Sequence, residues 1–93
     1  MTSLHPGEVL LHEYLKPRHI CQTQCAADTY IPVEQLTKIC LEQSPITADI
    51  AIRLAIYLGT TAQYWLVLQN DHDLMKAHKL SDDEFATIAP FVL

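Results

Sequence analysis

The sequence lacks the short motifs by which many enzymes are recognised. It contains only two glycines, and a glycine-rich phosphate loop, a nucleophile elbow and an HExxH motif are all missing, so we expect neither catalysis nor a cofactor. The longest apolar stretch, residues 50–68, contains Arg53 and is interrupted at Gly59, which argues against a membrane span. The three cysteines are odd in number and form no CxxC pair, so the sequence predicts neither a disulfide framework nor a metal site.

Positive charge is also scarce. Six Lys and Arg residues stand against eleven Asp and Glu residues, which gives a net charge of −5. Because no basic run or basic tail is present, the overall charge argues mildly against tight non-specific binding of nucleic acid and suits a basic protein partner. The start, MTSLHPGEVL, has no basic segment followed by an apolar stretch. We therefore expect no secretory signal and a cytoplasmic protein with reduced thiols.

Apolar residues, by contrast, are abundant for so short a chain. They make up 49% of the sequence, and charged residues only 18%, below the usual share of about 25%. A chain of 93 residues forms one small domain, predicted over residues 1–93, and its core is limited. Part of the apolar surface is therefore expected to be covered by a second copy or by another protein.

The apolar residues recur at helical spacing along almost the whole chain, and strand-like alternation is absent. This pattern predicts an all-α domain of five helices followed by a short C-terminal extra helix, within an extension at about residues 77–93. The predicted helices are, in chain order, EVLLHEYLK up to Pro17, Gln22 to about Thr29, one from near Pro32 that ends before Pro45, one from Thr47 to Gly59, one from Thr60 onward, and one from Ser81 to near Pro90.

Local signals refine the later helices. Residues 60–63 and 81–84 have the pattern of capping boxes, which makes Thr60 and Ser81 the expected N-caps. The helix DIAIRLAIYL is apolar almost all round, so we expect it to be the buried centre of the domain. A buried Arg53 needs a partner, for which Glu8 or Glu13 is the candidate.

Residues 22–41 fit a helix-turn-helix unit. Ala26 stands where two helices cross closely, and apolar residues occupy the packing positions, namely Cys25, Ile31, Leu36 and Ile39. Two positions depart from the usual pattern. Tyr30 stands where glycine is common because the turn needs a positive φ, so the chain either keeps this turn at a cost of about 1 kcal/mol or forms a different turn. Thr29 replaces a large aliphatic residue.

With these features in place, the chain resembles the HigA/VapI-type antitoxins of bacterial toxin–antitoxin modules. The resemblance rests on HPGEVLLHEYLKP, on the helix-turn-helix unit and on ITADIAIRLAIYLGTTAQYWLVLQNDHDL, and it covers about residues 5–76. It implies a lambda-repressor-like helix-turn-helix domain that forms a homodimer, binds double-stranded DNA at a palindromic operator in its own promoter, and neutralises a RelE-like (HigB-type) ribonuclease toxin.

The resemblance also places the second helix of the unit on DNA. The predicted DNA-binding residues are Gln22, Thr23, Val33, Glu34, Thr37, Lys38, Gln43 and Thr47, and Lys16 and Arg18 are further candidate contacts. Family members commonly have a pattern similar to NRISEIVNGKRSIT where this chain has EQLTKICLEQSPIT, so several basic positions are lost and Lys38 is the one cation left in the helix. Two alternatives therefore stay open: a protein-binding relative with weakened or lost DNA binding, and a stand-alone repressor without a toxin.

Overall fold

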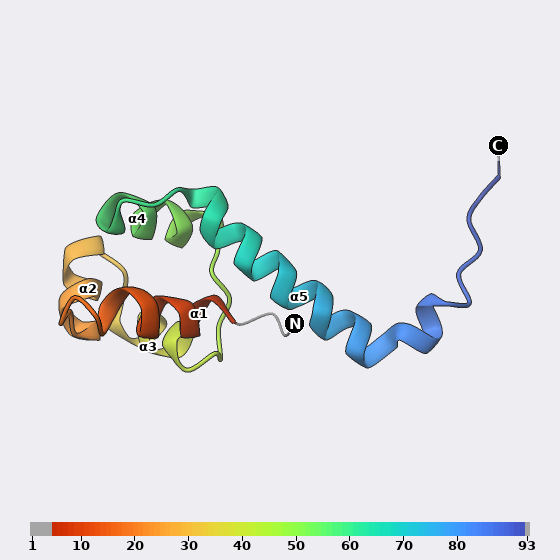
Figure 1. Ribbon diagram of the computed structural model, residues 1–93, viewed down its shortest axis with the longest axis horizontal. Helices are drawn as coiled ribbons and strands as arrows, with labels where there is room; N and C mark the ends of the chain where they lie inside the picture. The colour runs from red at the N-terminus through yellow and green to blue at the C-terminus, as the bar shows by residue number, and fades with distance from the viewer. Residues whose placement is uncertain (1–4, 93) are drawn as a thin grey trace.

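A computed structural model describes residues 5–92 of the chain, and within this range all regular structure is helical (Figure 1). The all-α prediction is thus confirmed. Residues 1–4 and residue 93 lie outside the described residues. The predictions for the start of MTSLHPGEVL and for the two ends of the 1–93 domain fall on them. The elements are α1 (Pro6–Val9), the π-helix η1 (Leu10–Leu15), α2 (Gln22–Thr29), α3 (Val33–Cys40), α4 (Ala48–Leu58) and α5 (Ala62–Phe85).

The first predicted helix corresponds to α1 and η1 together. It begins earlier than the prediction because the Nδ1 atom of His5 accepts a 2.9 Å hydrogen bond from the backbone N–H of Gly7 and caps the first turn. Pro6 follows this cap at a position where a missing N–H costs nothing. The second half winds as a π-helix, in which the N–H of Lys16 reaches the carbonyl of Leu11 at 3.0 Å.

The core lies between α1, η1, α2, α3, α4 and the first half of α5. Trp65 is its largest fully buried side chain, and the indole N–H donates a 2.8 Å hydrogen bond to the hydroxyl of Thr60. Because Thr60 is occupied in this way, Thr61 caps α5 instead, accepting from the N–H of Tyr64 at 3.1 Å. The predicted cap at Thr60 was therefore wrong by one residue.

The predicted burial of the fourth helix was also wrong on one side. Ile50, Ala51 and Leu54 of α4 are buried against the rest of the domain, whereas Ile52 is 52% exposed and Ile56 is 80% exposed. α4 packs mainly on α5 and α2, and within residues 5–92 no further helix covers its outer side.

The last helix extends well past the other elements, and the described chain measures 51 × 25 × 23 Å (Figure 1). At Ser81 the backbone leaves helical geometry (φ −135°, ψ 17°), and the segment beyond this kink ends at Phe85. The expected extra helix is therefore a short continuation of α5 that stops before Pro90. No helix in residues 5–92 is long and apolar enough to cross a membrane.

Candidate nucleic-acid interface

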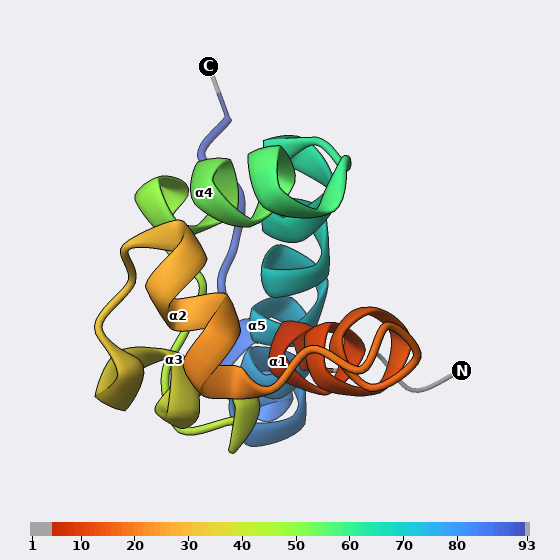
Figure 2. The ribbon, with the colours of Figure 1, turned by 90° about the vertical axis from the view of Figure 1, so that its left-hand side faces the viewer.

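The helix-turn-helix unit is formed by α2 and α3, which lie next to each other (Figure 2). α3 buries Leu36 and Ile39 completely, and α2 contributes Cys25 and Ala26 to the same contact. All four lie at the positions where the sequence predicted packing, as does buried Ile31. The opposite side of α3 is left exposed.

The turn between the two helices depends on Tyr30. Its φ of 58° and ψ of 31° lie in the left-handed region, so the usual turn is kept, and its N–H donates to the carbonyl of Ala26. Tyr30 as a whole is 84% exposed, so packing of its side chain does not compensate for this strain. Thr29 fits the place of an aliphatic residue because its buried hydroxyl donates a 2.7 Å hydrogen bond to the carbonyl of Cys25.

The predicted DNA-binding residues lie on three successive segments. Gln22 and Thr23 are the first two residues of α2, where Gln22 is half-buried and Thr23 is exposed. The second group lies along α3, and the third lies between α3 and α4. Of the α3 residues Val33, Glu34 and Lys38 are exposed and Thr37 is half-buried, whereas Gln43 and Thr47 are both exposed beyond α3.

This surface carries little positive charge. Lys38 is the single cation among the eight predicted residues, and Glu34 opposes it one turn earlier. Glu34 has a structural explanation, since Pro32 at the N-cap of α3 supplies no side-chain hydrogen bond and a carboxylate in the first turn complements the helix dipole. Thr47 likewise caps α4, its hydroxyl accepting from the N–H of Ile50 at 3.4 Å.

The two further candidate cations differ in their surroundings. Arg18 closes the end of η1: its Nη1 atom donates to the carbonyls of Tyr14 (3.1 Å) and Glu13 (3.3 Å), and the guanidinium lies 5.1 Å from the centre of the Tyr14 ring. Lys16 is exposed. Of these two candidates, Lys16 is thus the better placed for a partner.

Arg53 ties α4 to the end of α2. Its Nε donates to the carboxylate of Asp49 at 2.6 Å, and its Nη1 donates to the carbonyl of Thr29 at 3.0 Å. The predicted partners Glu8 and Glu13 were therefore wrong. The i, i+4 spacing of Asp49 and Arg53 on one helix was the signal that would have identified the carboxylate, whereas the bond to Thr29 depends on tertiary structure.

A second link between α2 and α4 was not foreseen. The hydroxyl of Tyr57 donates a 2.7 Å hydrogen bond to Asp28, which also accepts two 2.9 Å bonds from the amide of Gln24. The bond from Gln24, and then that from Tyr57, lowers the pKa of Asp28, and the hydrogen bond to Asp28 raises the pKa of Tyr57 to about 12. At neutral pH Asp28 is therefore ionised and Tyr57 protonated, and the hydrogen bond between them links α4 to α2.

The C-terminal end of α3 is fixed by α1 and α5. The backbone of Gly7 approaches the carbonyl of Ile39 closely, and the next segment is held where the N–H of Ile46 donates to Oε1 of Gln69 at 2.8 Å. Glu42, at the bend after α3, has a φ of 63°. These contacts set the path of the segment that carries Gln43.

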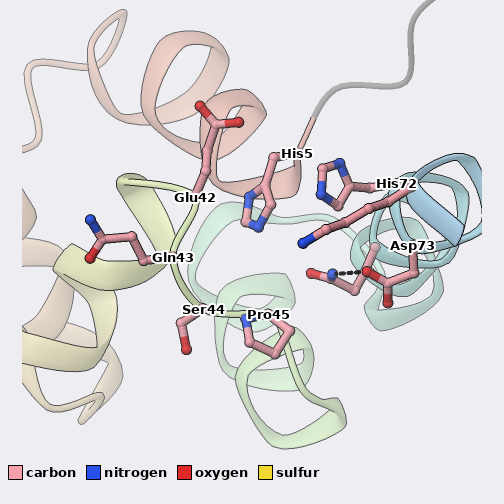
Figure 3. A pocket seen from close by; sticks show the side chains of 9 residues that line it. His5, Glu42, Gln43, Ser44, Pro45, His72 and Asp73 are labelled. Atoms are coloured by element: carbon pink, nitrogen blue, oxygen red, sulfur yellow. Dashed lines mark hydrogen bonds between the residues drawn. The ribbon is translucent and has the colours of Figure 1, made fainter. Parts of the chain in front are cut away.

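A pocket of about 290 Å³ lies beside this segment (Figure 3). His5 and His72 face each other there with their ring centres 4.8 Å apart, and Glu42, Asp73 and Lys76 provide charges of both signs. Because carboxylates stand beside the one lysine, this pocket is not suited to binding a phosphate. Among residues 5–92 no group of three His, Cys, Asp or Glu side chains is placed to hold a metal ion.

The comparisons with known proteins agree with this architecture, although no family model matches the chain. The chain is 40% identical to Virulence-associated protein I of Dichelobacter nodosus over 79 residues, which cover 85% of this chain and 73% of that protein. The structure of antitoxin GraA matches with a TM-score of 0.93 and 32% identity, covering 98% of this chain and 99% of GraA. Antitoxin HigA of Pseudomonas aeruginosa, solved with the higBA promoter, matches with a TM-score of 0.92 and 33% identity, covering 98% and 100% of the two chains.

Proposed function

The chain belongs to the family of HigA/VapI-type antitoxins, and from this premise we propose that it is a cytoplasmic antitoxin that also represses its own operon. In this proposal a homodimer binds a palindromic operator in its own promoter, with half-sites about one helical turn apart and α3 of each copy in the major groove. The same protein binds and neutralises a RelE-like ribonuclease toxin of the HigB type. We propose no enzymatic activity for it.

The observation that carries the proposal is the free outer side of α3. Leu36 and Ile39 are fully buried on the inner side, and Arg53 and Gly7 fix the elements around the helix. Because the backbone of α3 is already fixed, binding of its outer side chains to DNA costs little conformational entropy of the backbone. GraA has been solved in complex with its operator, and it shares 32% identity and a TM-score of 0.91 with this chain.

Within this proposal the predicted residues have different roles. Lys38 contacts phosphate or a guanine edge, Thr37 and Val33 contact bases, and Glu34 accepts from cytosine N4. We propose that the hydroxyl and amide groups of the remaining residues contact the backbone of the DNA. These residues are Gln22, Thr23, Gln43 and Thr47.

A second candidate function is favoured by the weak positive charge of the same surface. With Glu34 exposed and Lys38 as the single cation of α3, phosphate attraction is small. A relative that retains toxin binding while its DNA binding has weakened would have such a surface. The other alternative is a stand-alone repressor, which would need no toxin at all.

Fluorescence anisotropy with the DNA upstream of the chain's own reading frame tests the DNA-binding half, at low and near-physiological salt. We expect saturable, sequence-selective binding, and Lys38→Ala should weaken it and reduce the salt slope by about two per dimer. Lys79→Ala is the matched control, because Lys79 is an exposed lysine on α5, away from the helix-turn-helix unit. Unselective binding at both salts would favour the protein-binding alternative.

The toxin half needs a separate experiment. A small basic protein encoded beside this chain would be expressed with and without it, and growth and co-purification would be measured. The proposal expects growth arrest by the neighbour alone, relief by this chain, and a stable complex. A neighbour that neither arrests growth nor binds the chain would leave the stand-alone repressor as the better description.

A further inference from the structure

A hollow of about 260 Å³ opens between the end of α2 and the second half of α4, two helices that lie next to each other (Figure 2). The residues that line it are Asp28, Thr29, Tyr30, Arg53, Ile56 and Tyr57. Together with Ile52, one helical turn before Ile56, they are named here the α2–α4 face.

The rim of this hollow is apolar and uncovered. Tyr30 is 84% exposed, Ile56 80% and Ile52 52%. Ile52 and Ile56 share one side of α4 because they are four residues apart, and Ile56 and Tyr30 line the same hollow. Tyr30 also holds a strained φ of 58°, which no packing of its side chain within residues 5–92 offsets. Exposed apolar side chains grouped around a hollow indicate a surface that a partner covers.

The charge of the hollow is negative. The guanidinium of Arg53 is already engaged, because it donates to the carboxylate of Asp49 and to the carbonyl of Thr29. Asp28 accepts from two uncharged groups, the amide of Gln24 and the hydroxyl of Tyr57, and no Lys or Arg among residues 5–92 forms an ion pair with it. One negative charge is therefore left without a cation beside apolar walls.

This combination defines the side chain that fits. An arginine or lysine has an apolar stem and a charged end, so its stem matches Ile56 and its charge matches Asp28. The exposed ring of Tyr30 can also contact such a cation through its face. A second copy of this face brings another carboxylate and no unengaged cation, so two copies do not complement each other here.

The α2–α4 face is also separate from the proposed DNA contacts. Gln22 begins α2 and Thr47 caps α4, whereas Asp28 and Ile56 lie towards the other ends of these helices. At 1.5 Å per residue the separations along the two helices are roughly 9 Å and 14 Å. A partner in the hollow therefore needs none of the side chains that we propose for DNA.

We propose that the α2–α4 face binds the basic toxin, and that an arginine or lysine side chain of the toxin enters the hollow and pairs with Asp28. This inference rests on the proposed function and adds to it the surface that meets the toxin. Tyr30, Ile52 and Ile56 supply the apolar contacts around the ion pair.

Isothermal titration calorimetry of the full chain, with the small basic protein encoded beside its reading frame, tests the surface. Asp28→Asn removes the charge and keeps an oxygen that accepts from Tyr57, and Ile56→Lys places a like charge against the basic partner. Each variant should bind the neighbour at least about tenfold more weakly than the wild type.

Matched controls lie on α5. Asp71→Asn removes an exposed carboxylate, and Val67→Lys adds a lysine at a valine that is 54% exposed. Both should bind the neighbour as the wild type does. Circular dichroism checks that all four variants keep their helices, and fluorescence anisotropy should show unchanged operator binding in Asp28→Asn and Ile56→Lys.

The outcomes separate this inference from the proposed function. A wild type that does not bind the neighbour would contradict both. Tight binding by the wild type and equally by Asp28→Asn and Ile56→Lys would overturn the α2–α4 face alone, and so would equal weakening in the two controls. Sedimentation velocity of each chain alone tests the rival occupant, because a lower mass for Ile56→Lys would assign this face to pairing between copies. Loss of operator binding in either variant would assign it to DNA instead, and both results would overturn the inference.

Discussion

The backbone of Gly7 lies so close to the carbonyl oxygen of Ile39 that a Cβ atom built on residue 7 would be 1.7 Å from it. Both partners are main chain, so no side-chain rotation can relieve the overlap. The start of α1 and the end of α3 meet at this point, and the contact helps to fix the helix that we propose enters the DNA groove.

We therefore expect Gly7→Ala to destabilise the fold by about 3 kcal/mol, in the upper range for overpacking. Chemical denaturation followed by circular dichroism measures this loss. Gly59→Ala is the control, because Gly59 has a φ of 72° but a Cβ there would meet nothing within 4 Å. It should lose only the strain of the left-handed conformation, about 1 kcal/mol. Equal losses in the two variants would show that α1 moves away from α3 easily.

Replacing Tyr30 should have the opposite effect. Its φ of 58° is strained and its ring is exposed, so Tyr30→Gly should raise the free energy of unfolding by about 0.5–1 kcal/mol. Tyr30→Ala keeps the strain while removing the ring, and should change stability little. Thermal denaturation of the two variants measures both effects. A clear loss in both would mean that the ring contributes packing after all, for example in an assembled dimer.

The stability of the domain should depend on pH through His5. Burial lowers the pKa of this imidazole below its ordinary 6.5, and the facing His72 lowers it further; Glu42 and Asp73 oppose this shift, and Lys76 adds the smallest lowering effect. Only the neutral ring can accept the hydrogen bond from Gly7, at 2.9 Å. The contribution is therefore fully present above pH 6.5 and is lost as the pH falls through the lowered pKa of the folded state.

Differential scanning calorimetry between pH 8 and pH 5 tests this dependence. His5→Asn keeps a side chain that can cap α1 and has no proton to gain in this range. The melting temperature of the wild type should fall more steeply towards pH 5 than that of the variant. Parallel profiles would assign the acid sensitivity to other groups.

Thiol reactivity should separate the three cysteines. Burial raises the pKa of Cys25 and of Cys40 to about 11, whereas Cys21 is exposed. Because the thiolate is the reactive form, a chromogenic disulfide reagent at pH 8 should modify one thiol quickly in the native protein and all three in denaturant. Cys21→Ser should abolish the fast phase, and a fast phase that persists would show that the α2–α3 contact opens readily.

Much of the candidate site was predictable because its determinants are local. The period of the apolar residues placed both ends of α2 and the start of α3 within a residue, whereas α3 ends at Cys40, several residues before Pro45. Of the two possibilities for the turn, a strained left-handed Tyr30 or a different turn, the structure shows the first. Errors arose where one side chain had two possible partners. Thr60 had the pattern of a helix cap, but the indole of Trp65 takes its hydroxyl and leaves the cap to Thr61.

The sequence by itself determined the helical class, the helix-turn-helix unit and the scarcity of positive charge on α3, since these depend on residue types and on spacing within one helix. Tertiary structure alone decided the bond from Arg53 to Thr29, 24 residues apart, and that from Tyr57 to Asp28, 29 residues apart. It also decided which side of α4 stays exposed and that the end of α5 extends past the other helices. Those features depend on how separate helices pack, and helical periodicity carries no information about which neighbour a given side will meet.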